Sequence, residues 1–361
     1  MPEQSLSETT VYGARPVVRV DGEQPDRVHE LLLAAVVRIE EGGLASAELR
    51  FSNIASEESG DASWGFEDGA ILAHGKSVTV SFGDEEDPVE VFAGKITALE
   101  LEVSTESPPE LVVYAEDALL AARLSRRTKV YEDLSVADVV NQVAQGLGLT
   151  ADVDGLSNVT RTWVQLNESD LAFLRRVLDM HDADLQIVDG QLTVSARADR
   201  SGQTVTVGLN SQLRAARFFA DLAHQVTTVT TAGFDVSQGA AVNKSVSGRS
   251  PGPGSGRAGH SVLQDALGDR AEHVGDLRVS NDAEGQALAE AAFDQRARSF
   301  VTVDATVQGN PALRVGSRLE ITGVGPRFEN TYEVLAVIHR FDQLSGYQTD
   351  VHAVCAFLGG D

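Results

Sequence analysis

Two glycine-containing segments match patterns that perform chemistry in other proteins. The segment 248–252 (GRSPG) matches the nucleophile elbow G-x-S-x-G. The oxyanion hole of that motif uses the backbone N–H of the residue after the serine, and here that residue is Pro251, which has none. The segment 254–259 (GSGRAG) matches G-x-G-x-x-G. A dinucleotide site needs a hydrophobic strand before the first glycine, whereas 250–253 reads Ser-Pro-Gly-Pro. We therefore expect both segments to be loop.

The remaining candidates for chemistry are also weak. Gly75-Lys76-Ser77 resembles the end of a phosphate-binding loop, but Ala70 stands where the first glycine belongs and a strand is predicted to follow. The eight histidines include no H-E-x-x-H motif, and the acidic turn 84–88 lacks EF-hand spacing. Cys355 is the single cysteine, which excludes an intramolecular disulfide. The sequence thus names no catalytic, cofactor-binding or metal-binding residue, and we expect no cofactor.

The net charge of −25 disfavours specific binding to nucleic acid, because such binding depends on Lys and Arg at phosphates. The acidity fits either a solvated surface or an acidic channel wall. No apolar run approaches the roughly 20 residues of a membrane span, so no membrane insertion is expected. The N-terminal stretch MPEQSLSETT does not resemble a signal peptide, so we expect synthesis and folding in the cytoplasm.

The elements are easiest to predict in the middle of the chain. The segment 162–166 alternates and is rich in β-formers, which predicts a strand. Asn167 and Ser169 offer N-cap oxygens for a helix with apolar residues at helical spacing through Leu178. A hairpin is expected at 185–194, with its turn at Asp189-Gly190. A second helix should begin at Ser135, where Asp138 completes a capping box.

Short strands dominate the rest of the chain. The segments 31–40 and 44–51 are ambiguous between helix and strand, and the Gly42-Gly43 break favours two strands around a turn. Gly- and Pro-rich turns separate the other predicted strands, which indicates a β-barrel architecture. These strands are expected at 17–20, 78–82, 89–101, 111–115, 301–307, 319–322, 332–339 and 347–357.

Four segments carry a resemblance to one family. VQLNESDLAFLRRVL at 164–178 resembles the signature of phage late control D proteins, the baseplate hubs of contractile tails, which are similar to the N-terminal half of type VI secretion VgrG spikes. The segment 131–149 (YEDLSVADVVNQVAQGLGL) resembles the same family. So do 309–325 (GNPALRVGSRLEITGVG) and 332–354 (YEVLAVIHRFDQLSGYQTDVHAV). His339, Gly346 and Tyr347 stand where the second barrel of these proteins closes.

The resemblance implies a mainly β fold with an α+β insertion: two tube-like β-barrel domains plus a small peripheral α+β domain. We expect the first barrel at 1–119, completed by strands within 201–236, and the peripheral domain at 120–200. The second barrel is expected at 201–361, with a long flexible loop at 237–280 and a helix at 283–298. The loop 237–280 and the basic run 125–129 are candidate contacts with tube, spike or wedge proteins.

The resemblance further implies a structural baseplate hub, not an enzyme, in a contractile phage tail or a phage-tail-like injection system. Such a hub is a homotrimer whose ring joins the hexameric tail tube to the trimeric spike. Because the chain stops at Asp361, we expect the OB-fold spike to be a separate polypeptide. The alternatives are a tail-associated cell-wall hydrolase and a carbohydrate-binding β-protein. Two tryptophans and five tyrosines offer little stacking surface for either.

Overall fold

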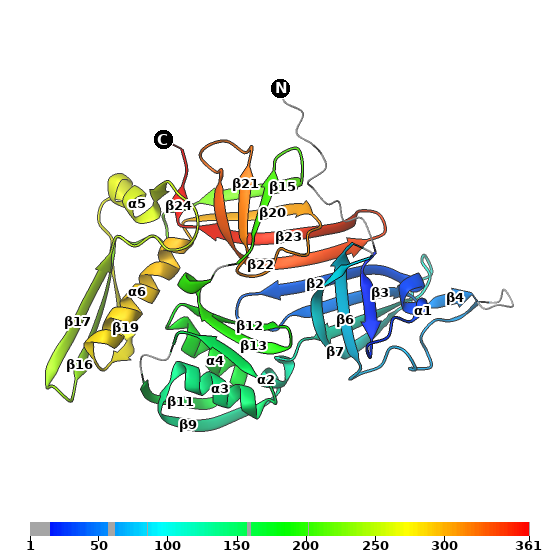
Figure 1. Ribbon diagram of the computed structural model, residues 1–361, viewed down its shortest axis with the longest axis horizontal. Helices are drawn as coiled ribbons and strands as arrows, with labels where there is room; N and C mark the ends of the chain where they lie inside the picture. The colour runs from blue at the N-terminus through cyan, green and yellow to red at the C-terminus, as the bar shows by residue number, and fades with distance from the viewer. Residues whose placement is uncertain (1–14, 57–61, 85, 157–159, 201, 361) are drawn as a thin grey trace.

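The computed structural model describes residues 15–56, 62–84, 86–156, 160–200 and 202–360. Strands predominate (Figure 1). Most helices lie either in a small α+β unit below the main sheet or beside that sheet in residues 228–298, which we call the arm. The predicted mainly β class with an α+β insertion is confirmed.

In the part of the chain that the structure describes, twelve strands form one continuous sheet. Their order is β1-β6-β7-β8-β3-β2-β22-β23-β20-β15, with β21 on β22 and β14 on β21. In chain order they are β1 (Val17–Val20), β2 (Leu32–Glu40), β3 (Ser46–Ser52), β6 (Ser77–Gly83), β7 (Pro88–Glu102), β8 (Glu110–Glu116), β14 (Thr204–Gly208), β15 (Leu213–Ala220), β20 (Val301–Gln308), β21 (Arg318–Thr322), β22 (Asn330–Asp342) and β23 (Gly346–Cys355). Helix α1 (Asp26–Leu31) precedes β2, and β4 (Ile54–Ser56) pairs with β5 (Ala62–Trp64).

Alternating side chains fill two hydrophobic cores on this sheet. Strand β3 buries Ala47, Leu49 and Phe51 in the first core, and β20 buries Val301 and Val303 in the second, as a period of two requires. The antiparallel pair β2–β22 joins the two halves, so the predicted barrels share a single hydrogen-bonded sheet.

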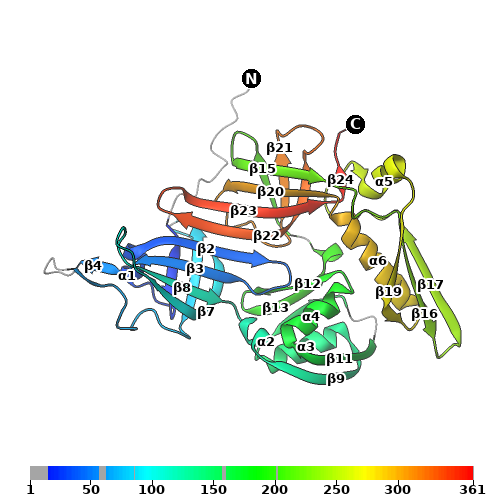
Figure 2. The ribbon, with the colours of Figure 1, turned by 180° about the vertical axis from the view of Figure 1, so that it is seen from behind.

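The long hairpin β22–β23 belongs to both cores. Phe341 and Tyr347, beside its turn, pack in the first core. Tyr332, Val334 and Val351 pack in the second core. Figure 2 shows the hairpin running along the boundary between the blue and orange parts of the sheet.

The expectation that strands within 201–236 complete the first barrel is wrong. Strand β14 pairs in parallel with β21, and β15 pairs with β20, so both belong to the second half of the sheet. Strand β16 (Thr228–Asp235) leaves this sheet for a smaller one. The alternation in these segments predicts strands, but it does not specify the partner of each strand.

The α+β unit forms the lower part of Figure 1. It contains α2 (Leu120–Leu124), β9 (Arg126–Ser135), α3 (Val136–Gly146), β10 (Ala151–Asp154), β11 (Thr160–Ser169), α4 (Asp170–Asp179), β12 (Ala183–Val188) and β13 (Gln191–Ala196). The capping box of Ser135 and Asp138 and the N-cap at Ser169 form as predicted. Both turn residues of the β12–β13 hairpin, Asp189 and Gly190, have positive φ, as its two-residue turn requires.

The predicted long loop at 237–280 is also wrong. The segment contains β17 (Ala240–Ser247), β18 (Arg257–Ala258), α5 (Gly259–Leu267) and β19 (Ala271–Val279). Strand β17 pairs with β16, and α6 (Asp282–Arg298), the helix expected at 283–298, covers Val242 and Val246 on one face. The Gly-, Ser- and Pro-rich composition that suggested a loop is confined to 248–256. Strand β18 pairs with β24 (Phe357–Leu358).

His339 lies where the two cores meet on β22. Its side chain has no exposed area, and its Nδ1 lies 2.8 Å from the Tyr347 hydroxyl. Tyr347 in turn stacks on Phe82 of the first core. Burial, with the Arg314 charge as a smaller cause, lowers the pKa of His339 to about 3. The histidine is therefore neutral in the folded protein across the usual pH range.

This buried histidine should make the fold sensitive to acid. Because the folded pKa is depressed below the ordinary 6.5, the unfolded chain binds the extra proton, and stability is lost as pH falls from 6.5 towards 3. His339 alone should cost about 2 kcal/mol between pH 6.5 and about pH 5. In His339→Gln, melting curves across this range should show a shallower pH dependence. The same substitution at the exposed His74 should retain the wild-type slope, and equal slopes for all three proteins would contradict this account.

Candidate functional site: a buried ionic junction and its cavity

A cluster of charged side chains lies where the sheet, the α+β unit and α6 meet. We call it the ionic junction. Its members come from segments that are far apart in the sequence, and all of their side chains are at most 16% exposed. They are Glu41 after β2, Asp182 and Asp184 near the start of β12, Arg197 and Arg200 after β13, Arg298 at the end of α6, and Glu333 on β22.

Each arginine of the junction binds carboxylates from different segments. Arg298 donates two hydrogen bonds to Asp182, at 3.0 and 2.9 Å, and its Nε lies 3.1 Å from Glu333. Arg197 donates to both oxygens of Glu41 at 2.9 Å and to Asp182 at 3.0 Å. Arg200 reaches Glu41 at 2.7 Å and Asp184 at 2.5 Å. Planar guanidinium groups suit such bidentate and bridging contacts.

The junction holds one more carboxylate than it holds guanidinium groups. Burial alone would raise the pKa of Glu41, but Arg197 and Arg200 hold it below its usual range. Burial raises the pKa of Glu333, with Arg298 and Arg200 opposing the shift. One Glu333 oxygen, Oε1, lacks a hydrogen-bond partner among the described residues. Glu333 is therefore the member that favours its protonated form.

The turn between β2 and β3 is fixed from the α+β unit. Arg175 of α4 donates to the carbonyl oxygens of Gly42 and Gly43 at 2.6 and 2.8 Å. Asp184 accepts from the Gly42 N–H at 2.5 Å. A Cβ at position 43 would lie 2.4 Å from Leu119 Cδ1, which is a clash. Only glycine therefore lets the turn pack this closely against the α+β unit. An arginine of the 164–178 motif thus fastens the insertion to the first half of the sheet.

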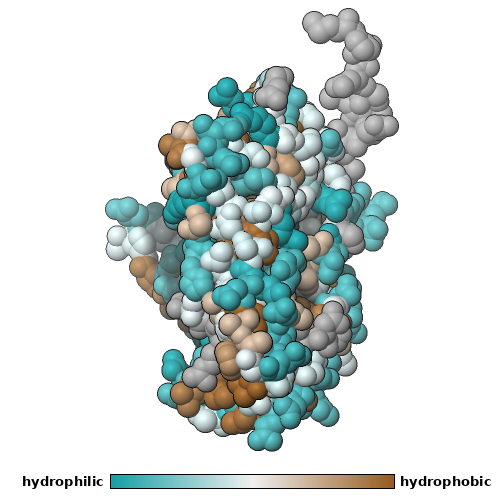
Figure 3. Space-filling view, turned by 90° about the vertical axis from the view of Figure 1, so that its left-hand side faces the viewer, coloured by the Kyte–Doolittle hydropathy of each residue, from teal (hydrophilic) through white to brown (hydrophobic). Residues whose placement is uncertain are grey.

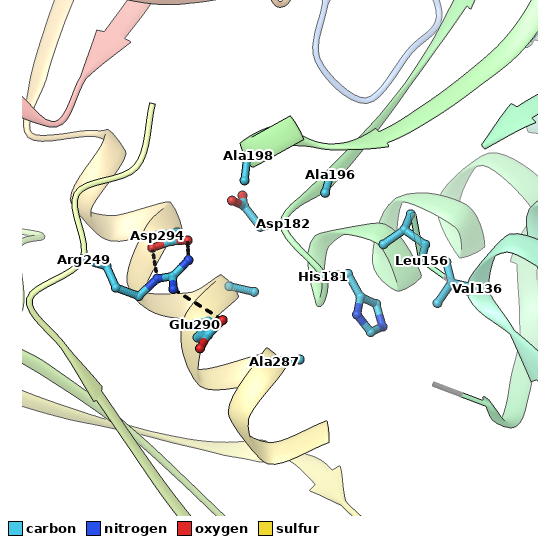
Figure 4. Close-up of a pocket in the computed structure, with 11 residues that line it drawn as sticks. Val136, Leu156, His181, Asp182, Ala196, Ala198, Arg249, Ala287, Glu290 and Asp294 are labelled. Atoms are coloured by element: carbon cyan, nitrogen blue, oxygen red, sulfur yellow. Dashed lines mark hydrogen bonds and ion pairs between the residues drawn. The ribbon is translucent and has the colours of Figure 1, made fainter. Parts of the chain in front are cut away.

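A cavity of about 240 Å³ opens between the α+β unit and α6 (Figure 4). On the α6 side, Arg249 donates to Asp294 at 2.7 and 2.6 Å and lies 3.4 Å from Glu290. On the opposite side lie Asp182 and His181. Burial, and to a lesser extent Arg161, lower the pKa of His181. Among the described residues, the lining carries aliphatic side chains and charged groups that are already paired, and no Ser, Thr, Cys, Tyr or Lys side chain that could act as a nucleophile.

Contacts at both ends of α6 hold the helix over this cavity. At its start, the buried Glu284 accepts from Arg161 of β11 at 2.6 Å. At its end, Gln295 donates to the Asp179 carbonyl at 2.7 Å and Arg298 binds Asp182. These contacts hold the arm against the α+β unit, so the charged groups around the cavity serve to position α6.

The structure separates the segments that the sequence singled out. Residues 248–252 form a loop after β17, as predicted. The prediction of a loop at 254–259 is only partly correct, because this segment contains β18 and ends on the first residue of α5. Lys76 is a turn residue whose ammonium lies 3.4 Å from Asp21. No group of three potential metal ligands occurs among the described residues. The basic run 125–129 lies at the start of β9, with Arg126 and Lys129 exposed.

The ionic junction was not predicted from the sequence. Its acidic members belong to a chain with 54 acidic residues, so their sequence context carries no signal. Asp182 and Asp184 alternate with the apolar Ala183 and Leu185, which predicts that the two carboxylates face solvent, so their burial could not be predicted either.

Comparison with solved structures places this architecture among proteins of phage tails and related secretion systems. The 43 kDa tail protein of prophage MuSo2 from Shewanella oneidensis is 12% identical, with a TM-score of 0.68 over 94% of this chain and 98% of that one. A tail protein from Neisseria meningitidis is 14% identical, with a TM-score of 0.66 over 95% and 97%. An E. coli type VI secretion component is 13% identical, with a TM-score of 0.56 over 94% and 76%. These likenesses show the fold.

The chain belongs to the family described as the Alg8 N-terminal domain, whose model matches residues 17–343. No curated protein sequence matches this chain. Within the described residues, no helix is both long and apolar enough to cross a membrane.

The charge balance of the junction predicts unequal effects of two substitutions. Arg298→Met should lower the free energy of unfolding by about 3–5 kcal/mol, because Asp182 and Glu333 lose a buried guanidinium. Glu333→Gln removes the excess carboxylate and should stay within about 1 kcal/mol of wild type. Urea denaturation near neutral pH measures both. Equal losses of unfolding free energy in the two variants would contradict the assignment of Glu333 as the excess carboxylate.

The Gly42–Gly43 turn predicts a second difference. Gly43 has φ +70° and no room for a Cβ, whereas Gly190 has φ +76° and open space around it. Gly190→Ala should therefore cost only the backbone strain, about 1–2 kcal/mol. Gly43→Ala should cost about 2–3 kcal/mol more, because Leu119 and Leu185 must also move. Matching melting temperatures for the two variants would argue against close packing at this turn.

Proposed function

We propose that this chain is a structural hub protein in the baseplate of a contractile phage tail or of a phage-tail-like injection system. The observation that carries the proposal is the fold likeness to two tail proteins over 94% and 95% of the chain. The late control D resemblance at 131–149, 164–178, 309–325 and 332–354 adds to it, because these segments span the α+β unit and the second half of the sheet. The proposed role is structural, without catalysis.

In this proposal the protein forms a homotrimeric ring between a hexameric tail tube and a trimeric spike. Each subunit contributes two β-cores, so three subunits offer six similar units to the tube and keep threefold symmetry for the spike. The domain division into 1–119, 120–200 and 201–361 belongs to the same proposal. The particle would be assembled in the cytoplasm.

Unpaired strand edges support a closed ring. Strands β1 and β15 end the large sheet, and each has a single strand partner within the described residues. Exposed edges invite pairing with other chains, and neighbouring subunits in a ring can cover them. In an isolated subunit, both edges lack a second strand partner among the described residues.

The arm offers a surface for partners beyond the ring. Figure 3 faces this side of the molecule and shows hydrophobic residues among hydrophilic ones near its lower end. Phe234 and Val236, at the tip of the β16–β17 hairpin, are 54% and 85% exposed. We propose contacts with tube, wedge or OB-fold spike proteins here.

The proposal predicts the mass of the protein in solution. Light scattering at several concentrations should give the mass of three chains, either for the protein alone or after addition of its OB-fold spike protein. Negative-stain images of that species should show a ring with a central hole. A chain that stays monomeric both alone and with the spike protein would contradict the hub role.

A further inference from the structure

The outer face of the β9–β11 ribbon differs from the rest of this acidic chain. The ribbon is a two-stranded antiparallel sheet, and β9 forms the lower border of the molecule in Figures 1 and 2. Its inner face buries Tyr131 and Trp163 against the α+β core. Its outer face presents aliphatic side chains to solvent: Val130 at 51%, Val164 at 46% and Leu166 at 69% exposed.

These aliphatic residues are contiguous. Val130 and Val164 are directly opposite each other in the strand register, and Leu166 follows on the same side of β11. Leu124, just before β9, is 66% exposed. Exposed aliphatic side chains that gather on one ribbon, unlike scattered ones, mark a site of protein contact.

Positive charge without a carboxylate partner lies along the free edge of β9: the alternation of the strand places Arg126 on the side of Val130 and Lys129 on the side of Tyr131. From Arg123 through Val130 the chain carries four basic residues and no acidic one. Arg123 binds Glu116, and Arg127 binds Asp170 at 2.8 Å. Within the described residues, Arg126 and Lys129 have no carboxylate at ion-pair distance. Arg126 donates only to the Asn167 carbonyl at 3.3 Å, and Lys129 lies 4.2 Å from the centre of the Tyr131 ring.

The ribbon also has a free backbone edge. Strand β9 has β11 as its single strand partner within the described residues, and all residues of 126–130 are exposed. Such an edge can accept an added strand, for which main-chain hydrogen bonds supply affinity and alternate side chains supply specificity. The cations on β9 oppose pairing with the same ribbon of a second copy, because like charges would meet.

We propose that the β9–β11 ribbon docks an acidic, extended segment of a partner protein along the free edge of β9. Carboxylates on one side of the partner segment would pair with Lys129, and an acidic residue near its end would pair with Arg126, while apolar side chains on its other side would cover Val130, Val164 and Leu166. The described residues of the outer face include no aromatic side chain on which bases could stack, so a protein fits this face better than a nucleic acid. This inference stands on the ribbon itself and does not require the hub role.

The test uses the full-length protein and fluorescent peptides in anisotropy titrations. A peptide of alternating Glu and Val should bind, whereas its Lys–Val counterpart should not. The double variant Arg126→Glu, Lys129→Glu should weaken binding at least about tenfold, as should Val164→Thr combined with Leu166→Thr. Lys95→Glu, a single charge reversal at an exposed residue of β7, should leave the affinity unchanged. Added salt should weaken binding.

A peptide N-methylated along one edge separates strand addition from simple charge attraction. It should lose most of its affinity, because it can no longer donate to β9. Equal binding by wild type and the charge-reversal variant would overturn the proposal. So would tighter binding of a DNA duplex, or of vesicles with anionic lipid, at the same residues. Circular dichroism of each variant confirms that loss of binding is not loss of fold.

Discussion

Three buried arginines determine how the parts of this protein are assembled. Arg197, Arg200 and Arg298 each join carboxylates from segments separated by many residues, so the β2–β3 turn, the start of β12, the end of α6 and β22 meet at one point. Hydrophobic packing within each core does not fix these relative positions. Buried ion pairs contribute little net stability compared with apolar replacements, so their value here is the unique geometry that they impose.

Local signals in the sequence predicted local structure well. The capping box at Ser135, the turn at Asp189-Gly190 and the alternation of β20 depend on neighbouring residues and were predicted correctly. Strand pairing was harder, because β14 and β15 find their partners about a hundred residues later in the chain. The hairpin β16–β17 was missed because the Gly- and Pro-rich stretch 248–256 dominated the composition of its surroundings.

The burial of charged residues was even harder to predict from the sequence than the strand pairing. In a chain with 83 charged side chains, only folding distinguishes the few that are buried. The basic run at the start of β9 was visible from composition alone. The aliphatic face beside it could be recognised only once the register placed Val130 opposite Val164. Prediction of such a surface requires knowledge of which face of a strand is covered, and sequence periodicity gives that information only for strands with one polar face.

The hairpin β22–β23 has a consequence for biosynthesis. The first core is built mainly from residues 18–115, yet Phe341 and Tyr347 complete it. During translation the N-terminal half of the sheet therefore emerges from the ribosome long before its last strand partner does. Its apolar face is therefore exposed to solvent, or bound by a chaperone, for most of the time that translation of the chain takes. The order of synthesis thus makes the final hairpin the step that closes both cores together.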